Sequence, residues 1–243
     1  MIKRTFDIVV SAVGLLLSSP VLLIFMLAVW LQDRHSPFYI APRVGKNGVL
    51  FNMVKMRSMV VNADKSGVDS TAADDPRITK VGNLIRKFKI DELTQLWNVL
   101  KGDMSLVGPR PQVQRDVDLY TDEERKLLSV KPGITDFSSI VFADENDILE
   151  GKTDPDLSYN QLIRPWKSRL GLFYIKNRSI VVDIILIMLT VLNSVNRKFA
   201  LSIISLMLRQ MDADPKFINV CKRNFDLKPF PPPGTDTIVV ERT

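Results

Sequence analysis

The 243-residue sequence contains a single cysteine, Cys221, and a single histidine, His35. One cysteine cannot form a disulfide within the chain, which is typical of a protein or domain that faces a reducing compartment. With one histidine, the sequence lacks the ligands of histidine-based zinc sites and the base of Ser-His-Asp or Cys-His catalysis. We therefore expect any catalysis to depend on carboxylates.

The sequence also lacks the zinc-ligand spacing, the RNA-binding aromatic motif and the basic zipper that mark nucleic-acid-binding proteins. It does have a moderate excess of positive charge, with 33 Lys and Arg against 27 Asp and Glu and a formal net charge of +6. Such an excess suits a nucleotide phosphate or an acidic lipid surface. We expect partners of these two kinds and no nucleic acid.

A long apolar run extends from residue 8 to residue 31. It has roughly two dozen residues, which is enough to span a bilayer as a helix. Lys3 and Arg4 precede it, and the polar residues 32–35 follow it without the small-residue cleavage site of a signal peptide. We therefore expect this membrane segment to be retained.

Ser19 and Pro20 interrupt the apolar run near its middle. Proline removes a backbone donor and clashes with the preceding turn. One interpretation is a kinked spanning helix, since proline is common in membrane helices. The other is a re-entrant helix-break-helix, because each half has about a dozen residues and is too short to cross alone. Basic residues flank both ends, which places both in the cytoplasm. We favour the re-entrant interpretation.

Beyond the membrane segment, residues 38–41 and 50–55 flank a glycine-containing turn and predict a β-hairpin. The helix predicted over residues 91–100 has its leucines and Trp97 on one face. Further helices are predicted over residues 78–90, from 121 onward, and over residues 159–177, 179–195 and 199–211. The last two are either buried or amphipathic helices at the lipid interface, and we favour the interface. Residues 228–234 predict a proline-rich linker before a loose tail.

Two adjacent carboxylates, Asp91 and Glu92, begin the helix predicted over residues 91–100. The pair has a purely structural explanation, because Asp is a favoured N-cap residue and Glu a favoured first-turn residue. Its surroundings favour chemistry, because Arg86, Lys87 and Lys89 lower carboxylate pKa values and offer ligands to phosphate. The segment therefore predicts a site for phosphate and a divalent metal.

A glycine-broken loop follows and carries Arg110 between Pro109 and Pro111. The two prolines restrict the backbone, and the planar guanidinium suits bidentate phosphate binding. The alternative is an ordinary surface loop. Lys55 and Arg57 alternate on the second predicted strand, so we expect both to face the same phosphates, unless they form a solvated basic edge.

Asp183 interrupts the apolar run of residues 179–195. A charge in such a run is unfavourable unless it is paired. We expect a cationic partner that supports the site, with Arg86 and Arg178 as candidates.

Together these motifs resemble the bacterial sugar transferase family, the monotopic polyprenyl-phosphate phosphoglycosyl transferases, also called undecaprenyl-phosphate sugar phosphotransferases. The resemblance covers residues 3–193 and is carried by residues 74–82, which begin at Asp74, and by residues 90–93, 95–111 and 131–135. The break at Ser19 and Pro20 lies where this family has its re-entrant membrane helix. Ala41 and Thr94 depart from the residues usual in the family, glutamine and proline.

The resemblance implies transfer of a phospho-sugar from a UDP-sugar to a polyprenyl (undecaprenyl) phosphate, with Mg²⁺ as cofactor and UMP as the released product. This reaction initiates assembly of a glycoconjugate such as exopolysaccharide, capsule, O-antigen or a glycoprotein glycan. The family's catalytic pair falls on Asp91 and Glu92. Asp91 would attack the β-phosphate to form a covalent aspartyl phospho-sugar, and the pair would hold Mg²⁺, chiefly through Glu92. Arg110 would clamp phosphate, and Arg86 would position the pair.

The expected fold class is α+β and mostly helical. A re-entrant helix occupies residues 1–34, a catalytic domain with a β-hairpin and interfacial helices residues 35–195, and a helical extension with a proline-rich tail residues 196–243. The resemblance implies the bacterial inner membrane, a domain facing the cytoplasm, and downstream glycosyltransferases as candidate partners. Two alternatives stay open. A glycosyltransferase would move the sugar alone and release UDP, and a non-catalytic membrane scaffold would recruit other enzymes of a glycan assembly complex.

Overall fold

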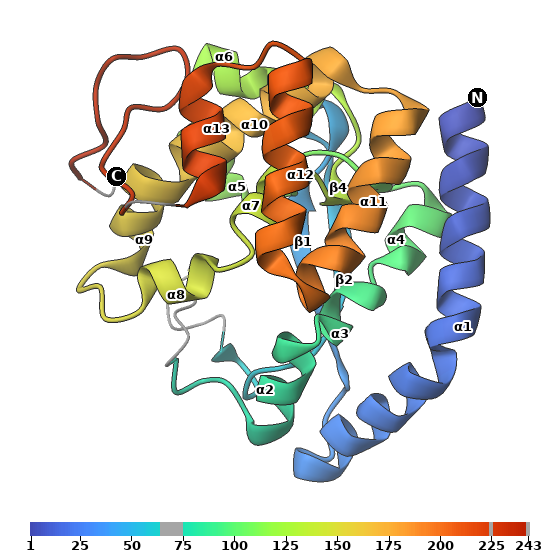
Figure 1. The fold of residues 1–243 in the computed structure, drawn as a ribbon. Helices are drawn as coiled ribbons and strands as arrows, with labels where there is room; N and C mark the ends of the chain where they lie inside the picture. The colour runs from blue at the N-terminus through green and yellow to red at the C-terminus, as the bar shows by residue number, and fades with distance from the viewer. Residues whose placement is uncertain (64–74, 224–225, 242–243) are drawn as a thin grey trace.

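The computed structural model describes residues 1–63, 75–223 and 226–241. Asp74, at the start of one sequence motif, lies outside these residues. Figure 1 shows a mostly helical molecule in which a β-hairpin and a short pair of strands lie among the helices, with the long helix α1 along one side. The predicted mixed and mostly helical architecture is confirmed.

Helix α1 (Ile2–Asp33) is one α-helix that includes Pro20, and it is long and apolar enough to cross a membrane. Pro20 has no N–H for the carbonyl of Leu16, and Ser19 Oγ donates to that carbonyl instead at 2.7 Å. Figure 1 shows the second half of α1 turning away from the direction of the first. The predicted interruption of the helix is therefore wrong, because the site is a bend within a continuous helix. Whether α1 spans or re-enters the membrane stays a prediction.

The predicted β-hairpin is confirmed and is slightly longer than expected. Strand β1 (Phe38–Val44) pairs antiparallel with β2 (Leu50–Met56). The turn between them contains Asn47 and Gly48 at φ values of 58° and 78°. Asparagine and glycine tolerate this left-handed backbone, so the chain can reverse within a few residues.

The chain then forms three short helices, α2 (Lys80–Lys87), α3 (Ile90–Leu93) and α4 (Leu96–Lys101). The single helix predicted over residues 91–100 is therefore wrong in detail. The predicted face is wrong at Trp97, whose side chain is 54% exposed. Asn98 turns inward instead, where it accepts a hydrogen bond from Val54 N and donates one to a backbone carbonyl of β2. These bonds fix α4 against the hairpin.

A parallel pair of strands, β3 (Ser105–Val107) and β4 (Gly133–Thr135), anchors the loop that follows β3. The two backbones approach closely at Gly108 and Gly133, where a Cβ on Gly133 would lie 2.0 Å from Gly108 N. Only glycine fits there. This contact fixes the start of the loop that carries Arg110.

The remaining helices pack around this centre and contain most of the hydrophobic core. They are α5 (Gln114–Asp118), α6 (Asp122–Arg125), α7 (Phe137–Val141), α8 (Glu145–Leu149), α9 (Pro155–Ser158), α10 (Arg164–Asn177), α11 (Ile180–Val195), α12 (Arg197–Gln210) and α13 (Pro215–Lys222). A helix begins at Thr121 as expected, and Thr121 and Glu124 form a capping box at the start of α6. One core joins residues such as Phe137, Leu170 and Ile204. Residues 196–223 thus share the core of the preceding helices, and the division into three parts stays a prediction.

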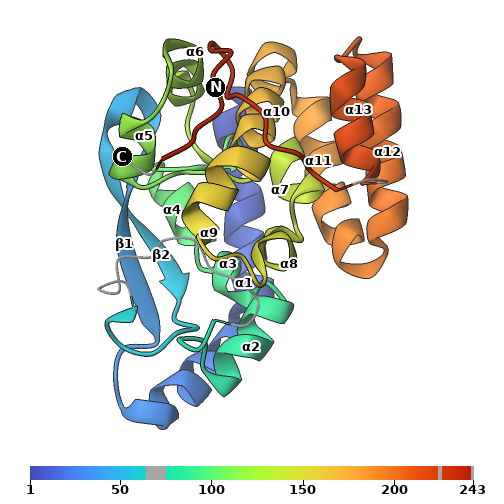
Figure 2. The same cartoon turned by 90° about the vertical axis from the view of Figure 1, so that its left-hand side faces the viewer.

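The loose tail predicted after residue 234 is mostly exposed, and it is held where Gln161 Nε2 donates to Val239 O at 2.7 Å. Residues 226–241 together form a C-terminal segment, which includes the proline-rich linker predicted over residues 228–234. Figure 2 shows this segment crossing the molecule from α13 toward α5. The ring of Phe230 stacks on Trp166 with centroids 4.5 Å apart, and Thr121 Oγ1 donates to Pro233 O at 2.5 Å. Stacking and hydrogen bonding offset the entropy lost on ordering the segment.

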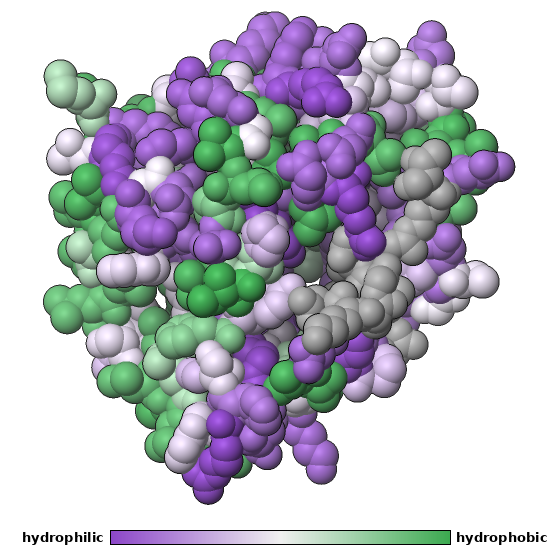
Figure 3. Space-filling model, turned by 180° about the vertical axis from the view of Figure 1, so that it is seen from behind, coloured by the Kyte–Doolittle hydropathy of each residue, from purple (hydrophilic) through white to green (hydrophobic). Residues whose placement is uncertain are grey.

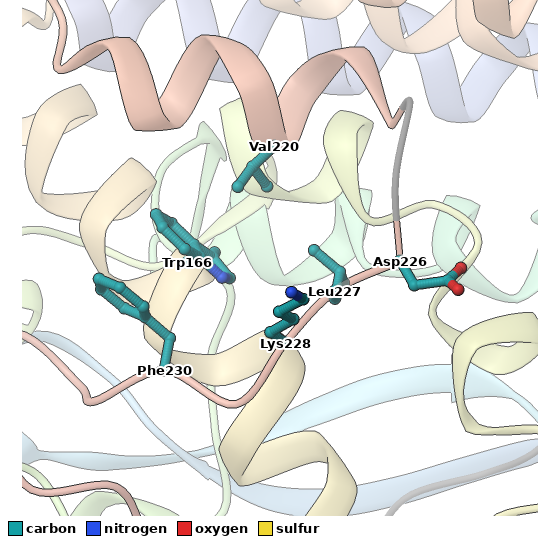
Figure 4. A pocket seen from close by; sticks show the side chains of 6 residues that line it. All are labelled: Trp166, Val220, Asp226, Leu227, Lys228 and Phe230. Carbon is teal, nitrogen blue, oxygen red and sulfur yellow. The ribbon is translucent and has the colours of Figure 1, made fainter.

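Between this segment, α10 and α13 lies a cavity of about 470 Å³ (Figure 4). Its lining residues are Trp166, Val220, Asp226, Leu227, Lys228 and Phe230. None of them belongs to the carboxylate pair or its cations, so this cavity is not where the sequence motifs place the chemistry.

Candidate active site

The two carboxylates of the sequence motif lie in the first turn of α3. Lys89 precedes this helix with a φ of 55° and occupies the N-cap position, and no side chain caps the helix there. The structural explanation that Asp91 is an N-cap residue is therefore wrong. The side chains of Asp91 and Glu92 are 15% and 19% exposed, so both are shielded yet still reachable by a ligand.

Cations from two other segments meet this pair. Arg110 Nη2 donates to Glu92 Oε1 at 2.8 Å, and Lys55 Nζ lies 3.8 Å from Asp91 Oδ2. Lys55 comes from β2 and Arg110 from the loop after β3, so three segments distant in sequence converge. Pro109 and Pro111 are both buried beside Arg110. The alternative of an ordinary surface loop is therefore wrong.

The two carboxylates differ in their electrostatic surroundings. Burial raises the pKa of Asp91, and the charge of Lys55 only partly opposes this. Burial also disfavours ionised Glu92, but the charge of Arg110 outweighs it, together with Lys89 and Lys55, and lowers the pKa of Glu92 to about 2. Glu92 is therefore firmly ionised and engaged by arginine, whereas Asp91 keeps the more basic and less restrained carboxylate.

The pKa of Lys55 is also shifted by its surroundings. Burial and the nearby charge of Arg110 lower the pKa of Lys55 to about 8, although Asp91 and Glu92 oppose the shift. The ammonium is still mostly charged at neutral pH. It loses its proton only in mildly alkaline solution.

Arg86 and Lys89 influence the pair through their charge. Burial lowers the pKa of Arg86, and the charge of Asp91 opposes that shift. Lys89 contributes to the lowered pKa of Glu92. Within the described part of the chain, neither cation has a hydrogen bond or ion pair with the two carboxylates. Both lie where they would add positive potential for an anionic substrate.

The prediction that Arg57 faces the same phosphates is wrong. Its guanidinium makes two bonds of 2.6 and 2.7 Å to the carboxylate of Asp33 and donates to Ser36 O at 2.8 Å. The reason is that β2 ends at Met56, so alternation along the strand no longer sets the direction of the next side chain. Arg57 instead fixes the end of α1 to the hairpin.

Both partners proposed for Asp183 are also wrong. Asp183, in the first turn of α11, accepts from Lys3 Nζ at 2.5 Å and from Tyr174 OH at 2.7 Å. Arg178 is exposed at the end of α10, and Arg86 belongs to α2. A partner 180 residues away cannot be found from local charge patterns.

Sequence reasoning missed a group of polar side chains that line a pocket beginning at Arg110. The lining includes Gln112, Tyr120, Asp136, Ser138, Tyr159, Arg164 and Lys167. Gln112 Nε2 donates to Tyr159 OH at 3.1 Å, and Lys167 pairs with Glu145. No motif marks these residues, because they are spread over loops and helices that are distant in sequence.

The carboxylate pair suits a magnesium ion that is shared with a substrate. Mg²⁺ typically takes one or two protein carboxylates and completes its shell with water and substrate phosphate. Asp91 and Glu92 are adjacent and partly exposed, and the cations Lys55 and Arg110 lie beside them. Among the described residues, no group of three or more His, Cys, Asp and Glu side chains is arranged as a metal site. The residues present thus fit an ion that arrives with a diphosphate.

Comparison with known proteins identifies the family. The family model described as bacterial sugar transferase matches residues 1–197, which include every residue of the site described above. The chain belongs to the bacterial sugar transferase family. Most of α12, all of α13 and the C-terminal segment lie beyond the part shared with the bacterial sugar transferases.

Three relatives show what the family match covers. The chain is 37% identical over 204 residues to the undecaprenyl-phosphate galactose phosphotransferase of Salmonella typhimurium, which covers 78% of this chain and 39% of that protein. It is 35% identical over 212 residues to an uncharacterized sugar transferase of Haemophilus influenzae, covering 81% and 41%. It is 32% identical over 204 residues to the exopolysaccharide production protein ExoY of Sinorhizobium fredii, covering 78% and 83%. The match thus spans about two fifths of the first two relatives.

Proposed function

We propose that this bacterial sugar transferase moves a sugar phosphate from a UDP-sugar to undecaprenyl phosphate and releases UMP. The supporting observation is the convergence of Asp91 and Glu92 with Lys55 and Arg110 in one half-buried site. The names of relatives supply the substrate class, because one is an undecaprenyl-phosphate galactose phosphotransferase and another a UDP-galactose-lipid carrier transferase.

The cations of the site suit the diphosphate of the donor. Arg110 offers a planar fork for two phosphate oxygens, and Lys55 adds a point charge on the other side of the pair. A diphosphate would otherwise be repelled by Asp91 and Glu92. Glu92 would hold Mg²⁺, with Asp91 as a second ligand. The ion, when bound, would neutralise negative charge on the diphosphate and on the departing UMP.

Asp91 is the better nucleophile of the two carboxylates. Glu92 is held by Arg110 at 2.8 Å, which lowers both its basicity and its freedom to move. Among the described residues, the only ion pair of Asp91 is the one with Lys55, at 3.8 Å, and burial raises the pKa of Asp91. A more basic oxygen with a weaker partner attacks phosphorus more readily.

The reaction then proceeds in two displacements at the same phosphorus. An oxygen of Asp91 bonds to the β-phosphorus, the bond from this atom to the bridging oxygen breaks, and UMP leaves with that oxygen. A phosphate oxygen of the lipid next bonds to the same phosphorus and the Asp91–phosphorus bond breaks. The products are UMP and a lipid diphosphate sugar, and neither step needs a histidine.

The contacts of α1 support the re-entrant arrangement at the membrane. Near its N-terminal end, Arg4 donates to Val99 O and Leu100 O at 2.5 and 2.7 Å. At its other end, Asp33 pairs with Arg57. A spanning helix would separate these ends by a hydrocarbon core of about 30 Å. Because both ends bind the same domain, we infer that both lie on the cytoplasmic side of the inner membrane.

An apolar surface accompanies this helix. Along α11, Ile184, Met188 and Val191 are exposed, although the opposite face of the helix is buried in the core. Seen from behind, hydrophobic residues gather along the edge where α1 lies (Figure 3). Exposed apolar helix faces of this kind suit contact with lipid. The helices predicted at the interface therefore include α11.

The released nucleotide tests the proposed function. Purified protein in lipid nanodiscs is mixed with Mg²⁺, undecaprenyl phosphate and, separately, UDP-galactose, UDP-glucose and UDP-N-acetylgalactosamine. The proposal expects repeated release of UMP from at least one donor when the lipid phosphate is present, and at most one UMP per protein molecule when it is absent. Release of UDP would indicate a glycosyltransferase, and no nucleotide product from any UDP-sugar tested would favour the scaffold.

A further inference from the structure

The N-terminal part of α1 is bound to the strand that leads to Arg110. Asp7 is only 3% exposed, although it belongs to the membrane helix. Its carboxylate accepts hydrogen bonds from Ser105 Oγ at 2.9 Å and from Leu106 N at 3.2 Å. Both donors belong to β3, whose end at Val107 is three residues before Arg110.

The other edge of β3 is already occupied by β4. Ser105 is paired with Gly133 and Val107 with Thr135, and Ser105 N donates to Pro132 O at 2.8 Å. Alternate N–H groups of a strand point to opposite sides. The N–H of Leu106 therefore points away from β4 and is satisfied by Asp7. The short strand is held from both sides, by a neighbouring strand and by a carboxylate of the membrane helix.

Two neighbours on α1 bind the surrounding backbone. Lys3 Nζ donates to Val107 O at 3.3 Å, at the end of β3. Arg4 donates to Val99 O and Leu100 O in the last turn of α4, the helix that follows the carboxylate pair. The first two turns of α1 thus hold both segments of the site, the one that carries Arg110 and the one that follows Asp91 and Glu92.

From these contacts we propose that Asp7 is a positioning residue for Arg110. Through β3 it sets where the loop begins, and so where the guanidinium meets Glu92 and the donor diphosphate. The catalytic consequence rests on the proposed function, whereas the placement of β3 does not. The membrane helix would then be part of the site's scaffold as well as an anchor.

A matched control exists at the other end of the same helix. Asp33 also binds the domain through a carboxylate, but its partner Arg57 follows β2, and the hydrogen bonds of Arg57 go to Asp33, Ser36 and Pro37. Asp33→Ala should therefore weaken the attachment of α1 to the domain without changing the loop that carries Arg110. Asp7→Asn is the conservative variant, because its amide can accept from Leu106 N and donate to Ser105 Oγ. Asp7→Ala leaves both groups buried without a partner.

The experiment uses the full chain in nanodiscs and has three arms: hydrogen exchange of residues 104–110, affinity for UDP, and UMP release. We expect Asp7→Ala to speed exchange in residues 104–110, because buried donors left without a partner destabilise the strand. UDP affinity and kcat/KM should fall by about tenfold, because displacement of the Arg110 guanidinium weakens a charged hydrogen bond to phosphate. Asp7→Asn should stay within about threefold of the parent. Asp33→Ala should leave exchange in residues 104–110, UDP affinity and the donor KM unchanged.

A double variant separates positioning from general stability. If Asp7 acts through Arg110, Asp7→Ala combined with Arg110→Ala should bind UDP and turn over within about twofold of Arg110→Ala alone. Independent effects that multiply, or parental exchange in residues 104–110 of Asp7→Ala, would overturn the proposal. If the parent releases no UMP with any donor, the proposed function fails. The Asp7 assignment is then decided by exchange and UDP affinity.

Discussion

Replacing Arg110 by alanine removes the guanidinium that lies 2.8 Å from Glu92 and would contact the donor diphosphate. Two losses follow. The phosphate loses a charged, forked donor in a shielded site, and Glu92 loses the cation that lowers its pKa to about 2. Removal of one such preorganised donor typically lowers kcat by about 10²–10³. We expect a loss in this range for Arg110→Ala.

The effect on folding should be small by comparison. The side chains of Arg110 and Glu92 are 29% and 19% exposed, so the orphaned carboxylate can be hydrated. Partly exposed ion pairs contribute about 1 kcal/mol or less. The thermal unfolding temperature of Arg110→Ala should therefore stay close to that of the parent. Arg110→Lys keeps the positive charge but lacks the planar guanidinium, so its activity should lie between those of the parent and Arg110→Ala.

The assay is the initial rate of UMP release in nanodiscs with the most active donor, followed as donor and lipid phosphate are varied. Unfolding is measured on the same preparations. Activity of Arg110→Ala within about twofold of the parent, with intact folding, would refute the assignment of Arg110 to the phosphate site. An equal loss in Arg57→Ala would also contradict it, because Arg57 binds Asp33 and not the carboxylate pair.

Three further predictions concern the membrane helix, pH and a buried ion pair. A cysteine at Lys3→Cys in the Cys221→Ser background should be protected from a membrane-impermeant thiol reagent in intact cells and labelled after lysis, because both ends of α1 bind one domain. The rate of UMP release should rise with pH as Asp91 ionises and fall again near the Lys55 pKa of about 8. Lys55→Arg should move this alkaline fall to higher pH. Arg164→Met should destabilise the fold by about 3 kcal/mol, measured by denaturant unfolding in detergent, because Glu124 is fully buried.

Each of these has a clear contrary result. External labelling of Lys3→Cys, with the domain still protected, would mean that α1 spans the membrane. An alkaline limb that is the same in Lys55→Arg as in the parent would assign that limb to another group. Stability of Arg164→Met within about 1 kcal/mol of the parent would mean that the buried carboxylate of Glu124 finds another partner.

Sequence patterns predict the parts of the candidate site that depend on local structure. They mark the carboxylate pair, the loop with Arg110 and the hairpin with Lys55, and the structure brings these together. Local patterns work here because turn residues, helix starts and charge clusters act over a few residues. The compensation of Pro20 by Ser19 is a local effect of the same kind.

The errors concern contacts between distant segments. The partner of Asp183 proved to be Lys3, and Arg57 turned to Asp33 once its strand had ended. The polar pocket beside Arg110 has no signature in the sequence, because its lining residues are scattered over several loops and helices from Pro109 to Ser168. Which of many compatible charges meet is decided by the packing of the whole chain. A pattern in one segment does not contain that information.

In the proposed reaction, Asp91 becomes covalently bonded to the sugar phosphate. Intact-mass analysis of the protein mixed with Mg²⁺ and UDP-sugar, without lipid phosphate, tests for this bond. We expect a mass increase equal to one phospho-sugar, with UMP released in equal amount, located at Asp91 by peptide mapping and absent from Asp91→Asn. Release of UMP without added mass, or turnover by Asp91→Asn, would contradict the covalent intermediate and indicate direct transfer between the two substrates.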